Sequence, residues 1–191
     1  MIRAFLAIIL LSIPITSWTC SCPPLSPNLV DKLFEEAELV FVGSPIENVH
    51  YNVSIKQEWD DSGFGTEVKF KVTKVLKGQL DSEYVFINQI ETDNCFLTFE
   101  FGDSYVIVGR RILNFQTMNP FSAYDFSHNE LPSPPSPSIL GVTIENYLCY
   151  NVEMEAIDFW NIIAEKEAVI YTNQCWAFES ESNYGKLLLG R

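Results

Sequence analysis

The chain has 191 residues, of which 47% are hydrophobic and 19% charged, a composition typical of a folded globular protein rather than a disordered one. It carries 25 Asp and Glu against 12 Lys and Arg, a formal net charge of -13, which argues against nucleic acid or an anionic membrane as its main partner. The two histidines, His50 and His128, are too far apart in the sequence to form an HExxH zinc motif, so that class of metal site is excluded.

The first 19 residues have the pattern of a secretory signal peptide. Arg3 supplies a positive charge, an apolar run covers residues 4–15, and small side chains stand at Ser17 and Thr19 before Cys20. This run is shorter than the about 20 apolar residues that a membrane-spanning helix needs. We expect cleavage after Thr19; a cut after Ser17 and a lipid-anchored Cys20 are the alternatives. The mature, acidic protein is then secreted, or periplasmic if the source is bacterial.

Five cysteines follow the signal, and in an oxidising compartment they predict a disulfide framework with one thiol left over. Their spacing does not select the pairs. A zinc site is the other use of clustered cysteines, but the chain has no CxxC motif, and no histidine is near a cysteine. The cysteines are Cys20, Cys22, Cys95, Cys149 and Cys175.

The first half of the mature chain predicts a helix followed by short strands. After a proline-rich start, Asn28 is a candidate cap for a helix over residues 29–37. Residues 57–65 are polar and predict a hairpin loop. The clearest strand is 67–76, where Val68 and Phe70 alternate with lysines. The predicted strands are 39–43, 67–76, 84–90, 96–101 and 105–108, which indicates a small antiparallel barrel or sandwich from about Leu39 to Val108.

The second half is less regular. Residues 112–143 form a loop insertion that contains five of the ten prolines, four of them in residues 131–137. An amphipathic helix is predicted over 152–168, with Ile157 and Trp160 toward the barrel, and residues 171–191 form a weakly patterned tail. We therefore expect one all-β domain with flanking helices over residues 20–170.

The mature start, Cys20-Ser21-Cys22-Pro23-Pro24, resembles the beginning of the tissue inhibitors of metalloproteinases (TIMPs), in which a Cys-x-Cys follows the signal peptide directly. The order of the helix, the "AELVFVG" and "VKFKVTKVLKG" strands, a cysteine and the "FGDSYVIVG" hairpin is similar to the wider superfamily of netrin-like domains. The resemblance covers about residues 20–149 and implies a five-stranded OB-type antiparallel barrel. It also implies the disulfides Cys20–Cys95 and Cys22–Cys149, with Cys175 unassigned.

Two departures weaken the functional part of this resemblance. No cysteine lies between Cys22 and Cys95, so the third disulfide of the inhibitory domain has no counterpart. The cysteine-rich C-terminal domain of the family is absent too. For Cys175 a lone reactive thiol, an intermolecular bridge and a bond to Cys22 all stay open.

The resemblance implies that the protein is an inhibitor of an extracellular or periplasmic zinc metalloprotease. The α-amine and carbonyl oxygen of Cys20 would chelate the catalytic zinc of the protease, which keeps an open coordination position. The ridge would comprise Ser21, Cys22, Pro23 and Pro24, with Asp93 and Asn94 as a second edge. The alternative is a non-inhibitory extracellular netrin-like binding or scaffold module in which the Cys-x-Cys only fastens the N-terminus to the barrel.

The sequence offers little support for other functions. It contains no GxSxG, no phosphate loop and no Cys-His nucleophile signature, so we expect neither an enzyme nor a cofactor. Asp60-Asp61 lacks calcium-loop spacing, and we expect no metal of the protein's own. His50 is expected to be a strand-end residue. Asn52-Val53-Ser54 is a glycosylation sequon if the source is a eukaryote.

Overall fold

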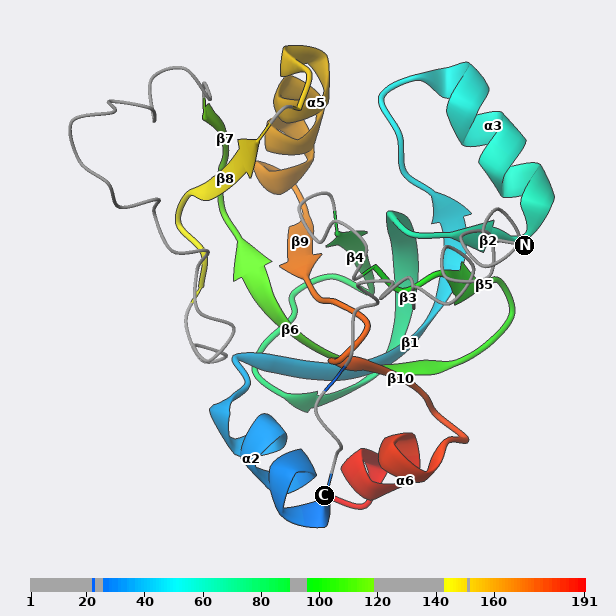
Figure 1. Ribbon diagram of the computed structural model, residues 1–191, viewed down its shortest axis with the longest axis vertical. Helices are drawn as coiled ribbons and strands as arrows, with labels where there is room; N and C mark the ends of the chain where they lie inside the picture. The colour runs from blue at the N-terminus through cyan, green and yellow to red at the C-terminus, as the bar shows by residue number, and fades with distance from the viewer. Residues whose placement is uncertain (1–21, 23–25, 90–95, 119–142, 151) are drawn as a thin grey trace, which may run out of the picture.

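A closed barrel of five strands forms the centre of the protein (Figure 1). The computed structural model describes residues 22, 26–89, 96–118, 143–150 and 152–191. The neighbours around the barrel are β1-β3-β4-β9-β6, and β6 then pairs with β1 to close the ring. The prediction of a five-stranded OB-type barrel with flanking helices is confirmed. The barrel strands are β1 (Leu39–Asn48), β3 (Val68–Lys77), β4 (Tyr84–Asn88), β6 (Tyr105–Ile112) and β9 (Ala168–Tyr171).

The barrel is mostly antiparallel, and the exception is the β4–β9 pair, which is parallel. A parallel neighbour requires a long crossover connection, and the chain between these two strands provides one that includes helix α5 (Met154–Ala164). The predicted limits of the barrel, Leu39 to Val108, are therefore wrong at one end. The strand that completes the barrel is β9. The sequence pattern predicts no strand there, because it assigns Ala168 to the end of the predicted helix 152–168 and leaves the residues after it unassigned.

Alternating side chains of the barrel strands fill separate cores on the two faces of the sheet. In β1, Leu39 and Phe41 point into the barrel, whereas Val40 and Val42 pack outward against helix α2 (Pro27–Glu36) and helix α6 (Asn183–Leu189). This period of two is the ordinary geometry of a strand buried on both faces. Inside the barrel, rings from β3, β5 (Phe99–Glu100) and β6 meet edge to face, among them Phe70, Phe99 and Tyr105.

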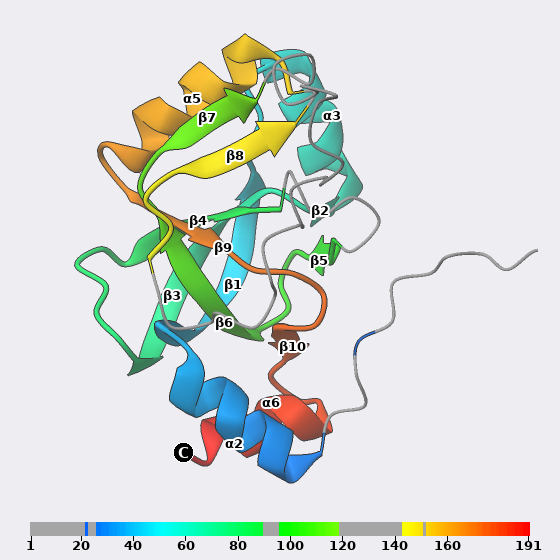
Figure 2. The same cartoon turned by 60° about the vertical axis from the view of Figure 1, so that its left-hand side comes forward.

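Helices close the barrel at two places. Figures 1 and 2 show α2 and α6 together below the barrel, where Arg191 pairs with Asp31. The cap of α2 is Ser26, not the predicted Asn28, because Pro27 takes the first helical position, where its missing N–H costs nothing. On the other side α5 covers a third core and buries Ile157 and Trp160, as predicted.

Helix α3 (Val53–Ser62) replaces the predicted hairpin loop over residues 57–65. Asn52 caps its start by accepting hydrogen bonds from two backbone N–H groups, and Gly63 ends it at a positive φ of 76°. None of its residues is buried, so the helix has no strong apolar stripe that periodicity would reveal.

Short strands complete the structure. β10 (Ala177–Glu179) pairs with β6, β2 (Phe64–Gly65) with β5 (Phe99–Glu100), and β7 (Phe115–Met118) with β8 (Tyr147–Tyr150). The expected loop of residues 112–143 thus begins with structured chain, whereas residues 119–142, with the prolines, lie outside the described residues. The weakly patterned tail contains β10 and α6. Within the described ranges no helix is long and apolar enough to span a membrane.

Candidate functional site

Cys22 is fixed to the barrel by a disulfide to Cys175, with the two Cα atoms 5.3 Å apart. The pairing Cys22–Cys149, which the TIMP resemblance implies, is therefore wrong. Cys149 is fully buried in the core under α5, on the opposite side of the barrel from α2. Cys175 precedes β10 and packs against the core beneath α2, the helix that follows Cys22 in the sequence. The disulfide is consistent with an oxidising compartment.

The remaining residues of the predicted inhibitory ridge lie outside the described residues, as does the second predicted disulfide, Cys20–Cys95. The proposed ridge and this pairing stay predictions, and so does the signal peptide of residues 1–19. The ridge residues concerned are Cys20, Ser21, Pro23, Pro24, Asp93 and Asn94.

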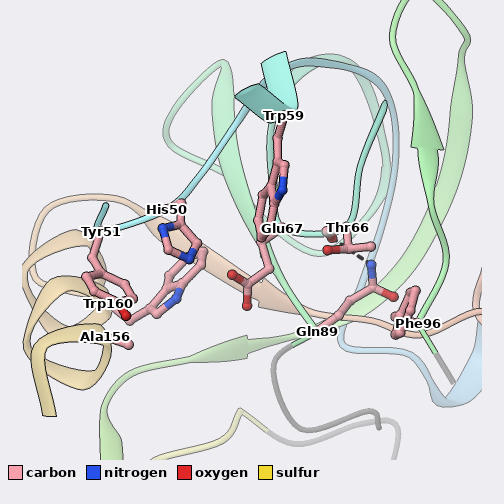
Figure 3. Close-up of a pocket in the computed structure, with 9 residues that line it drawn as sticks. All are labelled: His50, Tyr51, Trp59, Thr66, Glu67, Gln89, Phe96, Ala156 and Trp160. Carbon is pink, nitrogen blue, oxygen red and sulfur yellow. Dashed lines mark hydrogen bonds between the residues drawn. The ribbon is translucent and has the colours of Figure 1, made fainter. Parts of the chain in front are cut away.

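A cavity of about 300 Å³ lies between the barrel, α3 and α5. Figure 3 shows the side chain of Glu67 near its middle, with Trp59 above, Trp160 on one side and Phe96 on the other. The lining is mainly aromatic with a few polar groups, which is the usual character of a small-ligand site. The lining residues are His50, Tyr51, Trp59, Thr66, Glu67, Gln89, Phe96, Ala156 and Trp160.

Hydrogen bonds hold the floor of the cavity. The side-chain amide of Gln89 donates to the carbonyls of Thr66 at 2.7 Å and Leu97 at 2.9 Å, and its oxygen accepts from the Leu97 N–H at 2.8 Å. Gly65 approaches Asn48 so closely that a Cβ there would overlap the Asn48 side-chain oxygen. The start of β3, and with it Glu67, is thereby held against the neighbouring strands.

Aromatic rings form the opposite wall. The ring of His50 stacks on Tyr51 with centroids 4.6 Å apart and meets the edge of Trp59 at 5.0 Å. The Asn52 N–H donates to His50 Nδ1 at 2.9 Å, which orients the imidazole. Tyr51 donates to the carboxylate of Glu153, and this hydrogen bond raises the pKa of Tyr51. His50 follows the end of β1 closely, as the sequence predicted.

Burial raises the pKa of Glu67 from 4.5 to about 8, because the cavity walls remove water from the carboxyl group. The side-chain amide of Asn88 donates a hydrogen bond to Glu67 Oε1 at the long distance of 3.5 Å. No lysine, arginine or histidine of the described chain forms a salt bridge with it; the neighbouring Lys56 pairs with Glu47 and Asp60 instead. Glu67 is therefore mostly uncharged at pH 7.

Neither a protein-family model nor a curated protein matches the chain. The candidate site therefore has to be interpreted from its own geometry. In the part of the chain that the structure describes, no group of three or more His, Cys, Asp or Glu residues is arranged to hold a metal ion.

Sequence reasoning missed this cavity. The sequence pattern treats His50 as a strand-end residue and Glu67 as only the first residue of an alternating strand. Two signals were present in the sequence: the adjacent aromatic pair His50-Tyr51, and the glutamate that precedes a lysine-rich strand face. Neither signal shows that six separate segments of the chain meet at this cavity.

Proposed function

We propose that the protein is a secreted, TIMP-like inhibitor of zinc metalloproteases that acts through the N-terminus of the mature chain, Cys20. Three observations support this proposal: the OB-type barrel, the Cys-x-Cys after a signal-peptide pattern, and the Cys22–Cys175 disulfide. The disulfide carries most weight, because it fastens the residue that lies two positions after the proposed chelating group.

The chemistry requires a neutral α-amine held beside its own carbonyl oxygen. The two atoms together close a chelate ring on the protease's zinc and displace its water. An α-amino pKa of about 7.7–8.0 makes deprotonation easy near neutral pH. With Cys22 fixed, a span of two residues keeps the Cα of Cys20 within about 7 Å of the anchor, which limits the entropy lost on docking.

The decisive experiment compares two proteins that differ by one residue. Protein with a verified Cys20 terminus should inhibit at least one member of a broad metalloprotease panel with one-to-one stoichiometry, whereas a variant with one alanine ahead of Cys20 should not. Exchange of Ser21 for a bulky residue should change which proteases are inhibited, because its side chain would enter the specificity pocket. Inhibition that survives the extra alanine, or no inhibition by the verified protein, contradicts the proposal.

The second candidate is a non-inhibitory extracellular binding module. The cavity around Glu67 is the observation that favours it, because it lies between the barrel, α3 and α5 and none of its lining residues is Cys22 or Cys175. The two functions are separable by experiment, since the cavity does not contain Cys22 and should bind its ligand whatever the N-terminus is.

A further inference from the structure

We propose that the cavity between the barrel, α3 and α5 binds a small organic ammonium ion, with Glu67 as its counter-ion and the surrounding aromatic rings as its walls. This inference goes beyond the inhibitor proposal and does not depend on Cys20. It rests on the shape of the cavity, on the rings that line it and on the distribution of charge around it.

The rings provide surfaces that attract cations. The faces of Trp, Tyr and Phe are negative, and a cation within about 6 Å of a ring centroid is stabilised, most strongly by Trp. Trp59 and Tyr51 flank His50, Trp160 lies beneath them, and the Glu67 carboxyl group projects toward the same space (Figure 3). Several rings around one carboxyl group form the kind of enclosure that recognises methylated amines.

Within the residues that the structure describes, no lysine, arginine or histidine forms a salt bridge with Glu67. Lys56 on α3 bonds to Asp60 at 2.6 Å and to Glu47 at 3.1 Å, so its charge is already balanced. Lys69 on β3 pairs with Glu47 at 3.2 Å and lies over the ring of Tyr84, away from the cavity. An ammonium ion would supply the positive charge that the site lacks.

A cation fits the site better than a neutral or an anionic ligand. An anion would be repelled whenever Glu67 is ionised, and a neutral apolar ligand would make no use of the carboxylate. A bound ammonium ion stabilises the ionised form of Glu67, whose pKa burial raises to about 8, so binding at pH 7 should release a proton. The volume of about 300 Å³ suits a small molecule such as choline.

Other titratable groups at the cavity have to be considered in a proton measurement. His50 and Tyr51 lie on the segment after β1, and Glu153 and Glu155 of α5 act on Tyr51. On α3, Asp60 is engaged by Lys56. A variant that changes Glu67 alone therefore has to show whether the released proton comes from this residue.

Isothermal titration calorimetry with choline tests the proposal. As control ligand we would use its uncharged isostere, in which a quaternary carbon replaces the nitrogen. We expect millimolar affinity for choline and at least about tenfold weaker binding of the isostere, because only the charged ligand interacts with the carboxylate and the ring faces. Equal affinities would overturn the proposal, and so would the absence of choline binding at tens of millimolar.

Variants locate the site. Glu67→Gln and Trp59→Leu should each weaken choline binding at least about tenfold. Glu58→Gln is the matched control, because Glu58 is an exposed carboxylate on the same helix as Trp59 and does not line the cavity. Titrations at pH 7 in buffers of different ionisation enthalpy should show a proton released by wild type and none by Glu67→Gln. Unchanged affinity in a folded Glu67→Gln protein would refute the assignment.

Discussion

Replacement of Glu67 by glutamine should stabilise the empty protein at neutral and alkaline pH. Burial raises the pKa of this carboxyl group from 4.5 in the unfolded chain to about 8 in the folded one. Below pH 4.5 it is protonated in both states and has no effect. Between pH 4.5 and about pH 8 the carboxyl group is ionised only in the unfolded chain. Unfolding therefore releases a proton, and the free energy of unfolding falls as the pH rises. Above about pH 8 the group is ionised in both states, so the free energy of unfolding stays lower by the full amount.

The size of the effect follows from the same difference in pKa. A single such group lowers the free energy of unfolding by about 1.36 kcal/mol per pH unit, or up to about 2.7 kcal/mol between pH 5 and pH 7. The Glu67 residue as a whole is only half-buried, and solvent at the open side of the cavity screens part of the charge, so we expect about half of that. Glutamine keeps the shape and cannot ionise, so the variant should lose this slope.

Urea unfolding followed by circular dichroism at pH 5, 6, 7 and 8 measures the slope, with wild type, Glu67→Gln and the exposed control Glu58→Gln compared at each pH. Partial burial opposes ionisation of Asp60, but hydrogen bonds from Lys56 and the Asn48 backbone outweigh it and lower the pKa of Asp60. The stability that the ionised Asp60 contributes is therefore lost only below about pH 4, outside the pH range of this experiment. Parallel profiles for wild type and Glu67→Gln would refute the reasoning.

Two further predictions concern stability. Cys175→Ser should lower the free energy of unfolding by about 2–4 kcal/mol in urea titrations, toward the upper end because the disulfide spans 153 residues. Cys22→Ser should lose the same amount, and a double variant that loses clearly more would contradict the bond. Gly65→Ala should cost about 1–3 kcal/mol in thermal unfolding because its Cβ would overlap Asn48. Gly190→Ala, where the nearest atom lies at 3.5 Å and φ is −80°, should cost little, and equal losses would contradict the steric explanation.

Much of the barrel was predictable because its strands alternate or are continuously apolar. β3 shows this best, since its inward residues Val68 and Phe70 are fully buried, whereas the lysines that alternate with them, Lys69 and Lys71, are not. Helix α5 was predictable from its apolar stripe. Helix α3 was missed because nothing on it is buried, although Asn52 and Gly63 were present as start and stop signals.

The remaining features depend on contacts between distant segments. β9 is short and follows a helix almost at once, so its apolar residues extend the helical pattern instead of marking a strand. The partner of Cys22 is decided by the side of the barrel on which α2 packs, and spacing in the sequence carries no such information. The cavity, likewise, brings His50 and Trp160 together across 110 positions of the chain.

The position of β9 between β4 and β6 has a consequence for biosynthesis. Because a chain is made from its N-terminus, four barrel strands emerge before the fifth, and until then β4 and β6 present unpaired edges that invite intermolecular pairing. Cys22 also emerges long before its partner Cys175, and Cys95 and Cys149 are synthesised between them. A chain cut short before residue 168 should therefore aggregate or form mixed disulfides, because the barrel can close only when synthesis is almost complete.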